Sequence, residues 1–176
     1  MNFRLAGPAL RSLASTAIAL FAIPQIVAAH EDERYVDRNY GFSFSKPHFP
    51  PSDEKDVAIV AITLAGAPNG AFAPNLNVII QNVDTDLDAF AQLQREQLKS
   101  LGWEVIDHSR KQIGGLPALR THARGSLHGV EVEFLSVTLI RDQEKAYVLT
   151  CTATRAQFPL YEAEFDRVAS SLALGP

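Results

Sequence analysis

Alternation between apolar and polar residues predicts strands along much of the chain. Residues 40–45 alternate aromatic side chains with Gly and Ser, a period of two that is typical of a strand with one buried face. Residues 57–64 are apolar almost throughout, which predicts a strand covered on both faces, and residues 76–83 predict a third strand. Residues 65–75 are rich in Gly, Pro and Asn, so we predict a long loop between these last two strands.

Two other segments repeat their apolar residues every three or four positions, as amphipathic helices do. The first extends from Leu87 to Leu101 and follows Thr85-Asp86-Leu87-Asp88, which has the Ser/Thr-x-x-acid form of a helix start. The second has Pro159 in its first turn, where a missing N–H leaves no helical hydrogen bond unmade. Its apolar stripe consists of Phe158, Tyr161, Phe165, Val168 and Leu172.

Four more strands are predicted in the second half of the chain. They are residues 103–113, 118–124, 130–140 and 145–152. In the first of them, alternation places Trp103, Val105 and Asp107 on one side. The last three are separated by short turns, which predicts an antiparallel meander.

The turn at His128 and Gly129 predicts the register of two of these strands. If these residues are the centre of the turn, Arg124 faces Glu133 on the neighbouring strand. Opposite charges at facing positions stabilise a strand pair, so we expect a cross-strand ion pair there.

The first 29 residues have the three-part layout of a secretory signal peptide. Two arginines precede an apolar run, residues 13–23, and Val27-Ala28-Ala29 has the small residues of a signal peptidase site. A membrane anchor is the alternative, but a run of about eleven residues is shorter than the roughly 20 that cross a bilayer. We expect a mature chain that begins at His30, has no membrane span and is periplasmic or secreted.

The composition is that of a globular domain. Of 176 residues, 47% are hydrophobic and 20% charged, and there is a single Cys, which excludes a disordered chain and a disulfide scaffold. A net charge of -4 gives no attraction to a phosphate backbone, so no nucleic-acid partner is expected. Residues 30–176 are expected to form one domain. Its first residues, 30–38, are mostly polar and are interpreted as a solvated arm that Tyr35 could attach to the domain.

Four short motifs occur in a fixed order among the predicted elements. They are Phe72-Ala73-Pro74-Asn75-Leu76-Asn77-Val78, Gly114-Gly115-Leu116-Pro117-Ala118, Tyr147-Val148-Leu149-Thr150 and Phe165-Asp166-Arg167-Val168-Ala169-Ser170-Ser171-Leu172. Their order resembles the PsbP-like superfamily, which includes exported bacterial proteins of the DcrB type. The resemblance covers residues 35–172 and implies an α+β fold, an antiparallel sheet flanked by helices on both faces (an α/β/α sandwich). It also implies a binding or assembly factor and carries over no functional residue.

The polar clusters of the sequence have structural interpretations. Ser126 and His128 lie near glycines, but at a hairpin tip, where no third group orients the His. Cys151 lies in an apolar strand and is interpreted as a core residue. Glu131 and Glu133 alternate with valines and are interpreted as a solvated strand face, not as an acid–base pair. We therefore predict no catalytic residue and no enzymatic activity.

Metal ligands are considered separately, because the chain has five His residues. None of them has the spacing of a zinc site. A mature chain that begins with His30 offers an amine and an imidazole together to copper, but we favour the interpretation that His30 is an incidental first residue. No metal and no cofactor are predicted.

The loop of residues 65–75 is the candidate binding site. It holds no charged side chain and has Phe72 as its one large apolar residue, so an exposed Phe72 would anchor a partner. The alternative is that Phe72 folds back onto the sheet. Our first hypothesis is a non-enzymatic factor that binds an envelope or periplasmic protein. The second is a small-molecule carrier or enzyme with a cleft between sheet and helix. Trp103 and the aromatic stripe of the last helix could line such a cleft, but we favour a core position for them, because aromatic side chains commonly pack helices on sheets.

Overall fold

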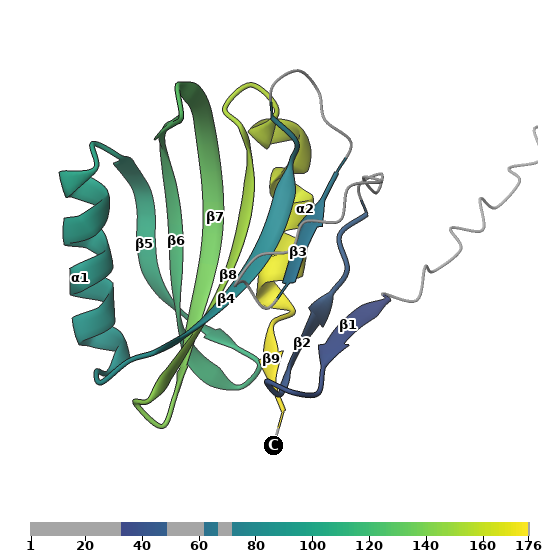
Figure 1. Cartoon of the computed structure of the whole chain (residues 1–176), viewed down its shortest axis with the longest axis vertical. Coiled ribbons are helices and arrows are strands. Elements are labelled where there is room, and N and C mark those ends of the chain that lie inside the picture. Colours follow the sequence, from purple (N-terminus) through teal and green to yellow (C-terminus); the bar gives the residue numbers. More distant parts are fainter. Residues whose placement is uncertain (1–32, 49–61, 67–71, 176) are drawn as a thin grey trace, which may run out of the picture. The chain divides into compact units, whose positions relative to one another are not determined.

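The computed structural model describes residues 33–48, 62–66 and 72–175, whose helices and strands are shown in Figure 1. In chain order the elements are β1 (Arg34–Asp37), β2 (Phe42–Ser45), β3 (Ile62–Ala65), β4 (Asn75–Asn82), α1 (Leu87–Ser100), β5 (Glu104–Ile113), β6 (Leu116–Leu127), β7 (Val130–Arg141), β8 (Lys145–Thr154), α2 (Phe158–Ser170) and β9 (Ala173–Leu174).

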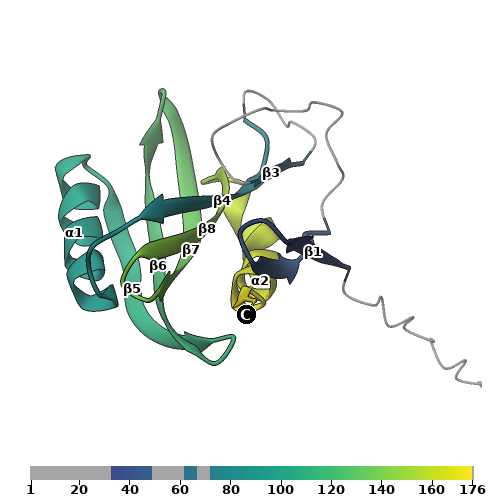
Figure 2. The same cartoon turned by 60° about the horizontal axis from the view of Figure 1, so that its bottom comes forward.

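Most of the strands belong to one antiparallel sheet. Its order is β3-β4-β8-β7-β6-β5, and β1, β2 and β9 form a second sheet in the order β1-β2-β9. In both views of the molecule α1 lies along β5, whereas α2 lies toward β1 and β2 (Figure 1 and Figure 2). The predicted α+β class, with helices on both faces of an antiparallel sheet, is confirmed.

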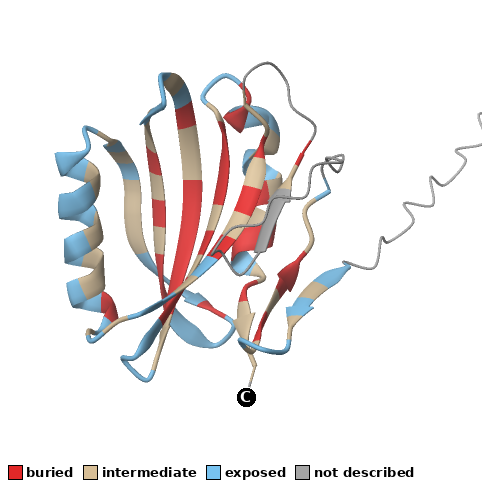
Figure 3. Ribbon diagram, in the orientation of Figure 1, coloured by how far each residue is buried: buried red, intermediate tan, exposed pale blue. Residues whose placement is uncertain are grey.

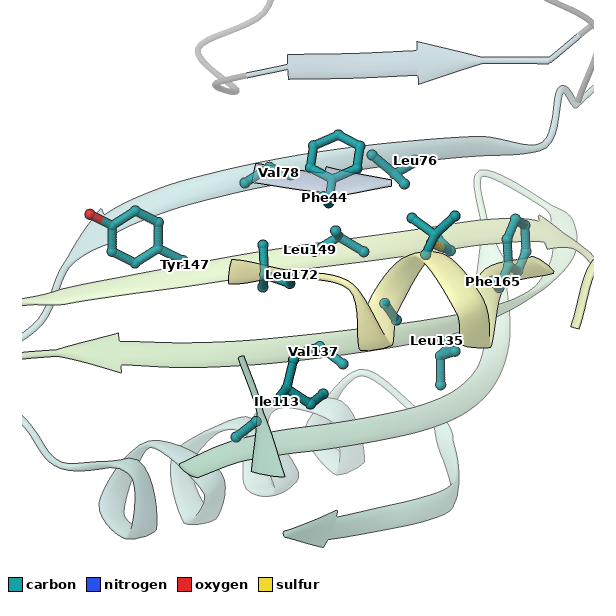
Figure 4. Packing of buried hydrophobic residues seen from close by; sticks show 14 of the residues in the cluster. Phe44, Leu76, Val78, Ile113, Leu135, Val137, Tyr147, Leu149, Phe165 and Leu172 are labelled. Atoms are coloured by element: carbon teal, nitrogen blue, oxygen red, sulfur yellow. The ribbon is translucent and has the colours of Figure 1, made fainter. Parts of the chain in front are cut away.

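The main core lies between α2 and the large sheet. Phe165 and Val168 of α2 are completely buried, together with Leu149 of β8. Figure 4 shows the packing of this cluster, with Phe165 and Leu149 labelled. Phe42 and Phe44 of β2 belong to the same cluster, so the small sheet covers part of it. Full burial of one such side chain contributes about 1.5–3 kcal/mol to folding.

The first described residues form a strand, where the sequence predicted a solvated arm. β1 pairs with β2 and places Tyr35 opposite Phe44, with ring centroids 5.3 Å apart. The ring of Tyr35 also lies 6.0 Å from that of Phe42. The prediction that Tyr35 attaches this segment to the domain is confirmed. The arm interpretation is wrong, because strand pairing and aromatic packing compensate for its charged composition.

The hairpin between β6 and β7 has the predicted register. His128 and Gly129 both have positive φ, as the central residues of a type I′ turn require, and Arg124 pairs with Glu133. The predicted ion pair between these two side chains is not the one that forms. Arg124 instead donates to both carboxylate oxygens of Glu104 in β5, at 2.6 and 2.7 Å. A bidentate pair is stronger than a single contact, so Glu104 is preferred.

β5 contains one residue more than the predicted alternation allows. Its register with β6 shifts between Val105 and Asp107, which leaves Ile106 as an extra, 46% exposed residue. A bulge of this kind changes the face on which the following side chains lie. The prediction that Asp107 shares a face with Trp103 and Val105 is therefore wrong. Asp107 lies on the α2 face, where it accepts a hydrogen bond from Arg120 at 2.7 Å.

Candidate functional site

Helix α1 covers the other face of the large sheet and buries little of its own surface. Leu87 is its one buried residue, and Figure 3 shows most of the helix as exposed or intermediate. The carboxylate of Asp86 caps the N-terminus by accepting hydrogen bonds from the N–H groups of Asp88 and Ala89, both at 2.9 Å. The cap is therefore Asp86, one residue after the Thr85 of the predicted motif.

Polar contacts join the middle of α1 to the sheet. The hydroxyl of Thr121 lies 2.8 Å from Oε1 of Gln94 and 3.1 Å from Nδ1 of His108. Nε2 of His108 lies 3.0 Å from the carbonyl oxygen of Ala91 and must carry the proton, because a carbonyl only accepts. Burial lowers the pKa of His108, which favours its neutral form. The interface under α1 is thus hydrogen-bonded, unlike the apolar interface under α2.

An open groove of about 500 Å³ lies between α1 and strands β4 and β8. Phe90 and Leu93 line it from α1, Ile79 and Val148 line it from the sheet, and Val83 lines it from the β4–α1 connection. Leu93 is 59% exposed and Ile79 is 40% exposed, so two large apolar side chains meet solvent here. The volume is in the range of sites that hold small ligands.

The remaining residues that line the groove are polar and almost uncharged. They are Gln81, Asn82, Asp84, Thr85, Gln94 and Gln97. Among the described residues of this lining Asp84 is the one with a charge, and it belongs to the β4–α1 connection. The groove therefore offers an anionic group no cation to pair with.

A row of polar side chains crosses the sheet on the α1 face. From β4 to β5 it consists of Asn77, Thr150, Ser136, Thr121 and His108. In the adjacent row, Thr138 pairs with Val148 of the groove. Ser136 and Thr138 are 2% and 1% exposed, and their hydroxyls, like Oδ1 of Asn77, have no hydrogen-bond partner among the residues that the structure describes. An unpaired buried polar group costs about 1–3 kcal/mol, so a ligand that reached one of these atoms and hydrogen-bonded to it would recover part of that cost.

Comparison with known proteins identifies the fold. No family model matches the sequence, and a comparison with curated proteins gives no match. The solution structure of cyanobacterial PsbP (CyanoP) from Synechocystis sp. PCC 6803 is similar, with a TM-score of 0.58 and 18% identity over 81% of this chain and 91% of that chain. The crystal structure of LpqN, involved in cell envelope biogenesis of Mycobacterium tuberculosis, has a TM-score of 0.54 and 15% identity over 85% and 88%. The chain has a PsbP-like fold.

Within this PsbP-like fold, Phe72 lies far from the groove. Its side chain is partly buried, and it precedes β4, whereas the groove begins at Ile79 of that strand. At 3.3 Å a residue, the two positions are separated by on the order of 20 Å. The centre of the predicted loop, residues 67–71, and His30 lie outside the described residues. The binding role of Phe72 therefore stays a prediction.

Glu131 and Glu133 do not share a solvated face. Glu131 is exposed, but Glu133 is largely buried, and its Oε1 lies 2.6 Å from Nε2 of His122. The ring of His122 in turn stacks on Phe158 of α2 at 4.9 Å. The interpretation is wrong for Glu133 because α2 covers the face that the alternation suggested was open to water.

The interpretation of Ser126 and His128 as residues of a hairpin tip is confirmed. Ser126 and His128 are exposed at the hairpin tip, and Trp103 packs on Phe134 with ring centroids 5.2 Å apart. In the described part of the chain, no three His, Cys, Asp or Glu side chains are grouped as metal ligands. Among the helices of that part, none has the length and apolar character needed to span a membrane.

Cys151 is completely buried in the main core, as predicted, and burial raises the pKa of its thiol well above the usual range. We expect Cys151→Ser to lower the thermal midpoint by a few degrees, because a hydroxyl would replace a buried sulfur. A thiol reagent should label native protein only after unfolding. Rapid labelling of the native protein, measured by mass spectrometry, would contradict this placement.

Proposed function

We propose that the protein is an exported, non-enzymatic binding or assembly factor of the bacterial envelope, with an envelope or periplasmic protein as its partner. The observation that carries the proposal is the groove between α1 and the sheet, where Leu93 and Ile79 expose apolar surface around one hollow. Concentrated apolar surface on a small domain marks an interaction site more often than scattered apolar residues do.

Three further observations support the proposal. Residues 1–29 have the pattern of a signal peptide, so export is expected. The order of the motifs resembles DcrB-type exported proteins, and one protein with a similar fold, LpqN, is involved in cell envelope biogenesis. The polar clusters of the described residues also have structural roles, such as the pairing of Glu133 with His122.

A small-molecule carrier is the second candidate function. It is favoured by the unpaired hydroxyls of Ser136 and Thr138 beside a groove of ligand size. An enzyme with its cleft in the same place would need an acid, a base or a nucleophile there, and the residues that line the groove are amides, apolar side chains, Thr85 and Asp84.

A capture experiment shows whether the partner protein binds at the groove or at the predicted loop that contains Phe72. We expect Leu93→Glu to abolish capture of an envelope protein by the tagged chain in cells of the native organism, because a carboxylate replaces an exposed apolar contact. Glu162→Arg is the matched control, since Glu162 is exposed on α2, away from the groove, and should leave capture unchanged.

The loop is tested by a deletion of residues 68–71 together with Phe72→Ala. Loop length changes stability little, so both this variant and Leu93→Glu should keep the melting transition within a few degrees. Loss of capture in the loop variant would support a contact at Phe72. Capture that survives both variants, or no specific partner with the unaltered chain, would refute the proposed function.

A further inference from the structure

We infer that the groove holds a small neutral amphiphile, whose apolar chain lies on Ile79, Val148 and Leu93 and whose polar head hydrogen-bonds to the hydroxyl of Thr138. A medium-chain alcohol or primary amide has this chemistry. The inference rests on the groove being a binding site, as proposed above, and adds the class of ligand. It also gives a role to the buried hydroxyls of Ser136 and Thr138, which make no hydrogen bond within the described part of the protein.

The register of the sheet places Thr138 next to the groove. Ile79 of β4 pairs with Val148 of β8, and Val148 pairs with Thr138 of β7, so the three side chains lie in one row across the sheet. Paired residues have Cβ atoms about 4.5–5.5 Å apart. A chain that lies across Ile79 and Val148 therefore points its end at Thr138.

Hydrogen bonding determines the kind of head group. Thr138 Oγ1 is buried without a partner, and Ser136 Oγ, in the next row, is in the same state. A hydroxyl both donates and accepts, so an alcohol or an amide could satisfy either of them. The ligand would supply the bond whose absence costs free energy in the unliganded protein.

The charges around the groove argue for a neutral head. An anion would lose its hydration without gaining an unpaired cation, because Asp84 is the one charged residue among the described residues that line the groove, and Arg110 of the Thr138 row is already paired with Asp88. A cation would be drawn to Asp84, which lies in the β4–α1 connection and not in the row of Thr138. Two titratable residues of the sheet lie near Thr138. His108 is in the adjacent row, and burial lowers its pKa; Arg110 is in the row of Thr138, beyond Leu119, and is paired with Asp88 of α1.

Helix α1 buries little apolar surface against the sheet, so a small movement of the helix could let the head group of the ligand reach Thr138. Its hydroxyl is not exposed, so neighbouring side chains must shift to admit the head group of the ligand. Leu87 is the one residue that α1 buries, and the hydrogen bond that the hydroxyl of Thr121 donates to Oε1 of Gln94 is a polar contact that a ligand head could replace. A small displacement of α1 therefore breaks few apolar contacts.

The test is a titration of the full chain with three eight-carbon probes: 1-octanol, octanoate and octylammonium. Methyl NMR signals of Ile79 and Leu93 report binding in the groove. We expect 1-octanol to shift these signals and to bind at least tenfold more tightly than either ion. Thr138→Val, which keeps the shape and removes the hydroxyl, should weaken octanol binding about tenfold.

Thermal unfolding adds an independent readout for the same variants. Thr138→Val should raise the melting temperature of the unliganded protein, because it removes an unpaired buried hydroxyl. Thr121→Val should lower it, because the hydroxyl of Thr121 is partnered. Thr154→Val is the binding control, since Thr154 ends β8 away from the groove and contacts Gln157.

Each outcome decides the inference. No shift of the Ile79 and Leu93 signals at octanol saturation, unchanged octanol affinity in Thr138→Val, or tightest binding by an ion would overturn it. If octanol fails to bind while Leu93→Glu still abolishes capture of an envelope protein, the amphiphile is excluded and the proposed function stands. If octanol binds but Leu93→Glu does not reduce the capture of any envelope protein, the groove is the ligand site of a small-molecule carrier.

Discussion

Phe165→Ala should lower the free energy of unfolding by about 3–5 kcal/mol, the range of large aromatic truncations in protein cores. Phe165 is 0% exposed at the centre of the α2 interface. Its ring packs edge-on against Phe158 at 5.6 Å and stacks on Tyr161 at 5.7 Å. Removal of the ring therefore leaves a cavity that its neighbours fill only in part. Urea denaturation followed by circular dichroism measures the difference.

Leu160→Ala is the matched control for this prediction. Leu160 lies on the same helix but is 80% exposed, so its truncation should change stability by no more than about 0.5 kcal/mol. Equal effects of the two substitutions would show that α2 does not pack on the sheet through its aromatic stripe. Both variants leave the groove under α1 untouched and should retain its binding properties.

The elements with strong periodicity could be predicted from the sequence. The stripe of α2 was correct because each of its aromatic and aliphatic residues meets the same apolar surface, so local pattern and tertiary packing agree. The His128-Gly129 turn was correct for a similar reason, since the backbone of a two-residue turn determines the register of both strands.

Single-residue irregularities and side-chain partners could not be predicted. Ile106 interrupts an alternation that continues on both sides of it, and only the pairing with β6 reveals the shift. Glu133 lies opposite Arg124 in the sheet, but the two side chains have different hydrogen-bond partners. Arg124 donates to Glu104, and Glu133 contacts His122. Alternation predicts a face and does not predict what covers it.

The groove could not be predicted for the same reason. It combines the end of β4, one side of α1 and Val148 of β8, which are distant in sequence. The sequence held one indication of an exposed apolar site, Leu93. This apolar residue lies outside the stripe of the same helix, which consists of Leu87, Phe90, Ala91, Leu98 and Leu101. In sequence, the alternating Ser136 and Thr138 of β7 resemble a solvated strand face, and only the structure shows that both side chains are buried.

Gly125→Ala tests a contact that could not be predicted from the sequence, because the predicted strand ends at residue 124, one position before Gly125. A Cβ at this position would lie 2.5 Å from Cδ2 of Trp103 and 2.9 Å from two further ring atoms. The ring of Trp103 cannot easily move away from this Cβ, because it packs on Phe134. We expect a loss of about 1–3 kcal/mol by overpacking, and a shift in the fluorescence of the single Trp.

A double-mutant cycle with Trp103→Leu decides whether the ring is the cause. A smaller side chain leaves space for the added methyl group, so Gly125→Ala should cost much less in the Trp103→Leu background than in the unaltered protein. Ser126→Ala, at an exposed neighbouring position, should have little effect in either background. If the costs of Gly125→Ala and Trp103→Leu simply add, the indole ring does not lie over Gly125, and the packing of β5 on β6 at this end of the sheet must differ.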